Sequence, residues 1–308
     1  MKICFMGSME FAVEILNGLN NEYGVDLVVT QPDKPFGRKQ ILKGTPVKER
    51  AKNLGIEVFQ PLAIKENYQR IIEEDFDFII VAAYGQIIPE IILKHAKFRA
   101  INIHASLLPN YRGGSPMHKA IINGDEYSGV TIMYMAKKMD AGPILSQEKV
   151  KIDFKDDVKT LELKLAKIGK NLLIDTIKEL VEGNVEPIKQ DKSKVTYAYN
   201  IKKSEKKINF NSKAIDIYNQ IRGMYPWPIA EILVDNKKIK VFKAEYLNKN
   251  TTKAPGTIYK IDKSGVFIQC LEDTIILKEI QLQGKKRMDI NAFMNGVGKQ
   301  FFYLDKII

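Results

Sequence analysis

Apolar positions follow two different periods along the first 183 residues. Short apolar runs typical of strands occupy residues 2–7, 25–30, 56–61, 77–83, 100–106 and 129–135. Segments with helical spacing lie between them: Phe11, Ile15, Leu16 and Leu19 share one helical face, and residues 157–182 repeat Val or Leu at helical intervals. This alternation predicts an α/β fold with a Rossmann-like, mostly parallel sheet and right-handed crossovers.

Capping residues give the expected starts and ends of the shorter helices. Ser8 is expected to cap the first helix, and Thr45-Pro46 and Ser115-Pro116 each pair a cap with a proline in the first turn. Gly55 and Gly124 are expected to follow the last residues of the latter two helices.

The pattern changes after Gly183. Residues 184–207 are polar and lysine-rich with no sustained period, which predicts a linker. A helix is expected near 213–223, followed by five short strands at 229–234, 238–246, 256–261, 265–270 and 274–282. Five strands in this space favour a small barrel of the oligonucleotide-binding (OB) type. The expected domains are therefore 1–183, a linker at 184–207, and an OB-like β-barrel domain at 208–308.

Composition narrows the class of protein. No apolar run approaches the roughly 18 residues of a membrane span, and the N-terminus lacks a signal-peptide pattern, so we expect a soluble cytoplasmic protein without membrane contact. Cys4 and Cys270 are expected to be buried free thiols, because two distant cysteines form neither a metal motif nor a disulfide framework. The net charge is +11, of which residues 204–308 carry +7 (18 basic minus 11 acidic). Such an excess indicates either a solvated lysine surface or a phosphate-binding face.

Two polar residues end the strand at 100–106. Asn102 and His104 are two positions apart, so both side chains project from the same face. Ligands of open α/β sheets bind beyond the carboxyl ends of the strands, where this pair is expected. An amide donor beside an imidazole is suited to stabilising an oxyanion, although a lone His is more often a packed or capping residue.

The segment MDAGPI supplies a carboxylate for the same edge. Asp140 follows the strand at 129–135, and a carboxylate can orient an imidazole and favour its charged form. Taken alone, Asp-x-Gly is ordinary turn chemistry.

These residues together resemble a known family. INIHASLLP, RGGSP and MDAGPIL are similar to the signature of formyltransferases that use 10-formyltetrahydrofolate, in which an Asn, a His and an Asp are catalytic. The resemblance places those roles on Asn102, His104 and Asp140. It implies 10-formyltetrahydrofolate as the formyl donor and no metal.

The resemblance continues over the whole chain. TQPDKPFGR, TPVK, FQP, AYGQIIP, the Thr196-Tyr197-Ala198 stretch and YPWP resemble the methionyl-tRNA formyltransferases. It therefore implies formyl transfer to the α-amino group of methionyl initiator tRNA, for translation initiation, by a protein that is expected to be a monomer.

The resemblance also assigns binding residues. The donor is expected to contact Ser106, Leu107, Leu108 and Pro109, and the backbone of Ala83, Tyr84 and Gly85; the tRNA is expected to contact the basic loop at 31–48 through Lys34, Arg38, Lys39 and Lys43. The C-terminal lysines are expected to face phosphates as a group. Trp227 is interpreted as a packing anchor, and His95 and His118 as structural residues.

Three alternatives differ in substrate or class. A formyltransferase for a small amine, such as an amino-sugar nucleotide or glycinamide ribonucleotide, would share the Asn-His-Asp chemistry but would not need a basic loop and a basic barrel. A dinucleotide-dependent oxidoreductase is disfavoured because Gly7 stands without the other glycines of G-x-G-x-x-G. A non-catalytic RNA-binding module would leave the polar sheet edge unexplained.

Overall fold

The computed structural model describes residues 1–37 and 40–308, which divide into two compact units. The first comprises Met1–Pro116, Tyr127–Lys151 and Glu162–Ala198, and the second comprises Met117–Glu126, Ile152–Leu161 and Tyr199–Ile308. Among these residues, no helix has the length and apolarity needed to cross a membrane.

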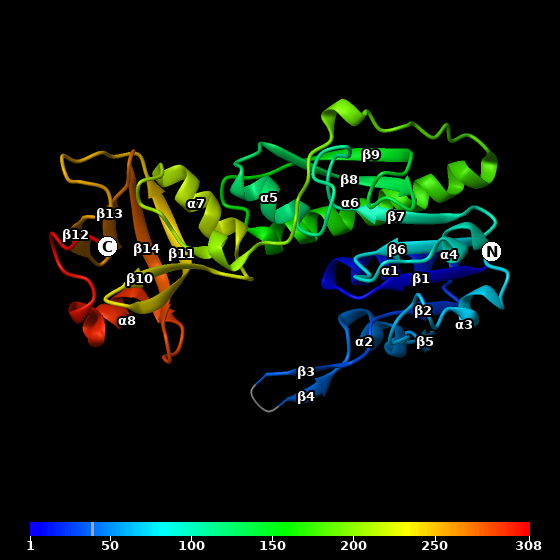
Figure 1. The fold of residues 1–308 in the computed structure, drawn as a ribbon, viewed down its shortest axis with the longest axis horizontal. Coiled ribbons are helices and arrows are strands. Elements are labelled where there is room, and N and C mark those ends of the chain that lie inside the picture. Colours follow the sequence, from blue (N-terminus) through cyan, green and yellow to red (C-terminus); the bar gives the residue numbers. More distant parts are fainter. Residues whose placement is uncertain (38–39) are drawn as a thin grey trace. The chain divides into compact units, whose positions relative to one another are not determined.

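The first unit contains a central sheet with the strand order β5-β2-β1-β6-β7-β8-β9 (Figure 1). Strands β5 to β7 of this order run parallel, while β8 is antiparallel to both β7 and β9. The predicted mostly parallel sheet is thereby confirmed. Its strands are β1 (Ile3–Gly7), β2 (Leu27–Val29), β5 (Glu57–Phe59), β6 (Phe78–Ala82), β7 (Ala100–His104), β8 (Tyr127–Tyr134) and β9 (Ile144–Lys151).

The predicted helices α1, α2, α5 and α6 begin and end close to the expected positions, with one exception at a cap, whereas α3 and α4 were not predicted. Oγ1 of Thr45 accepts a hydrogen bond from the Lys48 amide at 3.0 Å, as predicted. Ser8 is not a cap: α1 starts after Met9, and the Ser8 hydroxyl instead donates to the carbonyl oxygen of Tyr84 at 3.0 Å. The helices are α1 (Glu10–Tyr23), α2 (Pro46–Asn53), α3 (Gln69–Ile72), α4 (Glu90–His95), α5 (Pro116–Ile122) and α6 (Val158–Glu182).

The basic segment predicted as a loop forms a two-stranded hairpin instead. β3 (Lys34–Phe36) pairs antiparallel with β4 (Ile41–Lys43). All three residues of β4 are exposed, including Ile41 and Leu42, so this strand has no buried face that would produce an alternating pattern. Arg38 and Lys39, two of the predicted tRNA contacts, lie outside the described residues.

The second unit is built on an antiparallel sheet in the order β10-β11-β14-β13-β12, with β15 beside β14. The helix α7 and all five predicted strands are confirmed, as is the turn at Asp235-Asn236, where both residues have positive φ. Among the described residues β10 and β12 end this order and are not paired with each other. The elements are α7 (Ala214–Gly223), β10 (Ala230–Val234), β11 (Lys237–Leu247), β12 (Ile258–Asp262), β13 (Gly265–Gln269), β14 (Thr274–Leu282), β15 (Met288–Asp289), α8 (Ile290–Asn295) and three short 3₁₀ turns, Lys192–Lys194, Lys203–Lys206 and Val297–Gln300.

A candidate active site at the carboxyl end of β7

The face of β7 that carries Asn102 and His104 changes from apolar to polar at its carboxyl end. Ala100 belongs to an apolar cluster with neighbouring strand residues of the same face. Asn102 pairs in register with Val81 on one side and Met133 on the other, and His104 pairs with Thr131. Both polar side chains are largely buried, with 9% of Asn102 and 7% of His104 exposed. Because Ala100–His104 is a strand, Asn102 and His104 project from the same face of β7.

The His104 ring lies between two oxygen acceptors. Its Nε2 is 3.0 Å from the carbonyl oxygen of Tyr111, to which it can only donate. Its Nδ1 lies 3.8 Å from Oδ2 of Asp140. By contrast, within the described part of the chain the Asn102 amide has no side-chain hydrogen bond. The amide atoms of Asn102 are not among the fully enclosed atoms that lack a partner, so they remain accessible to a ligand with a polar oxygen.

Asp140 is fixed by contacts that the sequence did not reveal. Its Oδ2 accepts a hydrogen bond from the Gly113 amide at 2.8 Å, and its backbone adopts φ +50°. Nε2 of Gln190 donates to the carbonyls of Asp140 and Gly142 at 2.9 and 2.8 Å. The side-chain oxygen of Gln190 in turn accepts two hydrogen bonds from the buried guanidinium of Arg112.

Gln190, which holds the Asp140 loop, lies in the segment 184–207 that the sequence predicts to be a linker. That segment is attached to the first unit through the backbone pairings Ile144–Ile188 and Arg112–Tyr197. The sequence does not predict this attachment, because two isolated backbone pairings produce no repeating pattern of apolar residues.

The segment Ser106–Pro109, predicted to contact the donor, is held by a hydroxyl from β8. Oγ1 of Thr131 donates to the Ser106 carbonyl at 2.7 Å and accepts from the Leu108 amide at 3.1 Å. Gln147 on β9 donates to the Leu108 carbonyl and to the same hydroxyl. Leu108 is buried in a small cluster with Met133 and Ile144, and Leu107 is half-buried. The segment is therefore fixed next to the polar end of β7.

The second predicted donor segment follows β6 and has mixed exposure. Ala83 and Gly85 are exposed and both have positive φ. Tyr84 is buried in the core, burial raises the pKa of its phenol, and its carbonyl oxygen accepts from Ser8 and from Gln31. Its backbone oxygen is thus already used internally, which leaves Ala83 and Gly85 as the open positions.

The described part of the basic hairpin connects to this same network. Nζ of Lys34 donates to Oε1 of Gln31 at 2.6 Å, and Gln31 reaches the Tyr84 carbonyl. Nearby, Lys48 forms an ion pair with Asp33 at 2.6 Å, and this pair lowers the pKa of Asp33 after the larger effect of a hydrogen bond from Gln60. Lys43 is exposed on β4.

The interpretation of Trp227 as a packing anchor is wrong. Its side chain is 66% exposed, so it is not a packing anchor. The two prolines beside it shape the turn but do not determine whether the ring is covered. The Nε2 atoms of His118 and His95 contact the carbonyl oxygens of Trp227 at 3.2 Å and Glu74 at 2.8 Å, and a structural role for both stays a prediction.

Comparisons with known proteins match both units. Residues 1–177 match the formyl transferase family, and residues 200–298 match the formyl transferase C-terminal domain. The methionyl-tRNA formyltransferase of Staphylococcus aureus (strain MW2) is 42% identical over 298 residues, 96% of each chain. The methionyl-tRNA formyltransferase of Listeria innocua is 44% identical over 301 residues, 97% of this chain and 96% of that one.

Solved structures share the fold at lower identity. An N-formyltransferase from Helicobacter canadensis, in complex with folinic acid and dTDP-3-aminofucose, gives a TM-score of 0.69 at 21% identity and covers 90% of this chain and 98% of that chain. HypX from Aquifex aeolicus in complex with tetrahydrofolic acid gives 0.65 at 14% identity, covering 96% of this chain and 47% of that chain. On the strength of the nearly full-length identities, the chain belongs to the methionyl-tRNA formyltransferase family of formyl transferases.

Proposed function

We propose that this protein transfers the formyl group of 10-formyltetrahydrofolate to the α-amino group of methionyl initiator tRNA, for translation initiation. The observation that carries the proposal is the convergence of Asn102, His104 and Asp140 at the carboxyl end of β7. It is supported by the nearly full-length identity of 42–44% to proteins named methionyl-tRNA formyltransferase.

Each polar group at the site has a distinct task in this reaction. A C–N bond forms between the amine and the formyl carbon, the bond to the donor nitrogen breaks, and negative charge develops on the formyl oxygen in between. The Asn102 amide, which has no other side-chain partner in the described chain, is the donor for that oxygen. Both nitrogens of the His104 ring face other oxygens, so we assign it the supply of positive charge near the formyl oxygen and not a second hydrogen bond. Asp140 faces its Nδ1 and supports the imidazolium while the amine proton moves to the donor nitrogen.

The surroundings of the triad fit a formyl donor. Ser106–Pro109 is immobilised against Thr131, and Ala83 and Gly85 present exposed backbone after β6. We assign these two segments to the donor, with the half-buried Leu107 as an apolar contact. The Ser106 hydroxyl donates to the Asn110 carbonyl at 2.7 Å and its carbonyl accepts from Thr131, so Ser106 positions this segment from within.

We assign the tRNA to the basic surfaces. Lys34 and Lys43 lie on the β3–β4 hairpin, Arg38 and Lys39 follow β3 in the sequence but lie outside the described residues, and residues 204–308 carry a net +7. Phosphate contacts of this kind give affinity that falls with salt and does not depend on sequence. We also propose that the reaction takes place in the cytoplasm. A monomer remains our expectation, and light scattering of the full chain tests it.

A small-amine formyltransferase is the remaining alternative, since solved sugar N-formyltransferases share the fold. One assay separates the two. The protein is incubated with 10-formyltetrahydrofolate and either methionyl initiator tRNA, an amino-sugar nucleotide or glycinamide ribonucleotide, and formylated product is quantified. We expect formylation of the tRNA with kcat/KM far above that of either small amine. Preference for a small amine would refute the tRNA assignment.

A further inference from the structure

The exposed ring of Trp227 calls for an explanation. It stands in the turn that follows α7, and it is the only tryptophan in the chain. Because two-thirds of this large ring is exposed, it contributes little of the hydrophobic stabilisation that a buried tryptophan would give. Exposed tryptophans are enriched where a partner covers the ring.

The ring lines a cavity of about 460 Å³ in the second unit. The walls combine aromatic and apolar groups with lysines from two segments. They include Trp227, Phe242, Ile229, Lys203, Lys206 and Lys240. A planar apolar platform surrounded by ammonium groups matches a ligand that is both aromatic and anionic.

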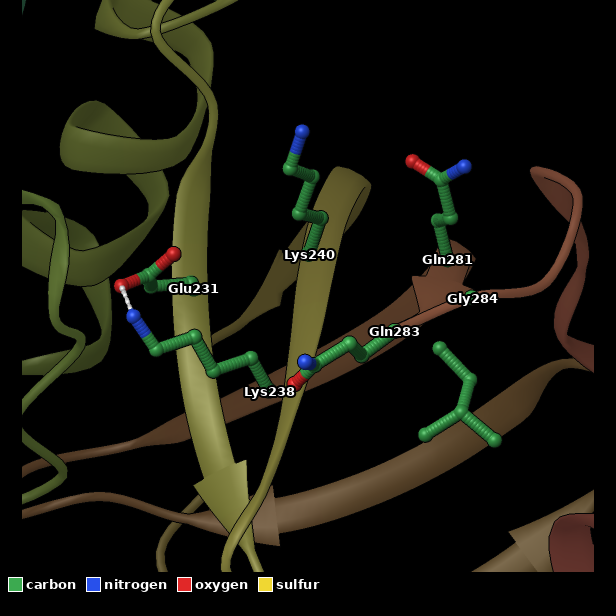
Figure 2. A pocket seen from close by; sticks show the side chains of 7 residues that line it. Glu231, Lys238, Lys240, Gln281, Gln283 and Gly284 are labelled. Atoms are coloured by element: carbon green, nitrogen blue, oxygen red, sulfur yellow. Dashed lines mark ion pairs between the residues drawn. The ribbon is translucent and has the colours of Figure 1, made fainter.

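The lysines differ in how far their charge is neutralised. Lys206 forms an ion pair with Glu231 at 3.0 Å, and Lys238 reaches the other oxygen of that carboxylate at 3.7 Å. Lys203 and Lys240 have no acidic partner within the described chain. Figure 2 shows an adjoining cavity that shares Lys240: Lys238 turns toward Glu231, while Lys240 and Gln281 project together from neighbouring strands. Positive charge is thus left at Lys203 and Lys240.

The turn that holds the ring is fixed rather than loose. Nε2 of His118 contacts the Trp227 carbonyl at 3.2 Å. Ile229 adopts φ +69°, which is strained for a β-branched residue, and is held there by its buried side chain and by a hydrogen bond to the Met224 carbonyl at 3.0 Å. Strain retained in a surface turn is a feature of binding sites.

Phe242, the second aromatic residue of the cavity, already contacts a cation. The Arg287 guanidinium lies 4.4 Å from the centre of the Phe242 ring and is itself held by Glu279. Trp227 is therefore the ring that is open for stacking.

We propose that this cavity binds one unstacked nucleotide of the tRNA substrate, with its base on Trp227 and its phosphates on Lys203 and Lys240. The inference rests on the proposed function for the identity of the RNA. Bases stack on aromatic rings regardless of sequence, because every base has a π-face, and lysines supply the salt-sensitive backbone contacts. The site would therefore add affinity for the RNA without adding sequence specificity.

The single tryptophan allows a direct test. Uncharged initiator tRNA transcript is titrated into the full-length protein while tryptophan fluorescence is recorded, and we expect saturable quenching. Binding of labelled transcript is then compared among variants. We expect Trp227→Ala to raise Kd about 5- to 100-fold and Trp227→Phe to retain most of the affinity. Lys203→Ala and Lys240→Ala should each reduce the slope of log K against log salt by about one.

Tyr303→Ala is the matched control, because Tyr303 is an exposed aromatic residue of the same unit outside the cavity. It should bind tRNA as the wild type does. Urea unfolding and donor binding verify that each variant is folded, and Trp227→Leu replaces Trp227→Ala if the latter is not.

Absence of quenching, or equal Kd for Trp227→Ala and Tyr303→Ala, would overturn the proposal. If the wild type formylates methionyl-tRNA in that case, only the cavity assignment fails. If quenching is seen but no formyl transfer to tRNA, the proposed function fails instead.

Discussion

Oδ2 of Asp140 lies 3.8 Å from Nδ1 of His104, although the two residues are 36 positions apart along the chain. The carboxylate oxygen is also anchored by the Gly113 amide, so its position does not depend on the histidine. Orientation of the imidazole is thus imposed by a loop that is itself fixed through Gln190. The site is preorganised by backbone contacts before any substrate arrives.

Removal of either donor at the end of β7 should slow the chemical step. Asn102→Ala deletes the amide that we assign to the formyl oxygen, and His104→Ala deletes the imidazole. We expect each to lower the single-turnover rate by about 10²-fold or more, the usual cost of losing an oxyanion donor. Donor binding and urea unfolding serve as controls for the fold. Folded variants that transfer formyl at the wild-type rate would remove these roles.

Gln190→Ala should destabilise the Asp140 loop. The buried Arg112 guanidinium loses an acceptor, and we expect the free energy of unfolding to fall by about 1.5–3 kcal/mol. Gln190→Glu is the matched variant, because it keeps an acceptor for Arg112 and loses the donor to the Asp140 and Gly142 carbonyls.

Urea unfolding and kcat are measured for both Gln190 variants. Reduced kcat in both variants, with donor binding intact, is the expected signature of a positioning residue. Wild-type kcat in both variants would show that the loop holds Asp140 without Gln190.

Gly113→Ala should impair both stability and catalysis. Gly113 has φ +123°, and a Cβ there would lie 2.7 Å from the Ala198 carbonyl oxygen, so the backbone that donates to Asp140 must shift. Gly183→Ala is the control: Gly183 also has positive φ, but nothing lies within 4 Å of its added Cβ. We expect Gly183→Ala to cost about 1 kcal/mol with normal kcat, and Gly113→Ala to cost more and to lower kcat. Equal losses in urea unfolding and equal kcat would contradict this reasoning.

Arg38→Ala should weaken use of tRNA more than binding of the folate donor. The expectation comes from the sequence motif at residues 31–48 and from the basic character of the hairpin. KM for methionyl-tRNA should rise while Kd for the donor stays unchanged. A parallel change in both constants would place Arg38 at the donor site instead.

The five parallel strands are recognisable in the sequence because most of them are buried throughout and therefore form continuous apolar runs. Asn102 and His104 interrupt the run of β7 two positions apart, which predicts a shared face. The edge strand β9 and the β3–β4 hairpin were missed because their exposed positions carry no apolar alternation. The prediction that Ser8 caps the first helix is wrong because its hydroxyl, which is buried at the end of β1, donates to the Tyr84 carbonyl instead. Gln190 was not identified because its contacts depend on tertiary structure alone.

His118 should make stability depend on pH through the Trp227 turn. Burial lowers the pKa of His118 below its ordinary value, and its Nδ1 is buried without a hydrogen-bond partner in the described chain. Well above the ordinary pKa of about 6.5, both the folded and the unfolded chain are neutral at this residue. As pH falls through that value the unfolded chain takes up the proton first, so the free energy of unfolding decreases until pH reaches the lower folded pKa. His118→Gln keeps a donor for the Trp227 carbonyl and does not titrate. The free energy of unfolding is measured in urea between pH 5 and 8 by tryptophan fluorescence. It should depend less steeply on pH for His118→Gln than for the wild type. Identical dependences would mean that the His118 ring is not desolvated in the folded protein.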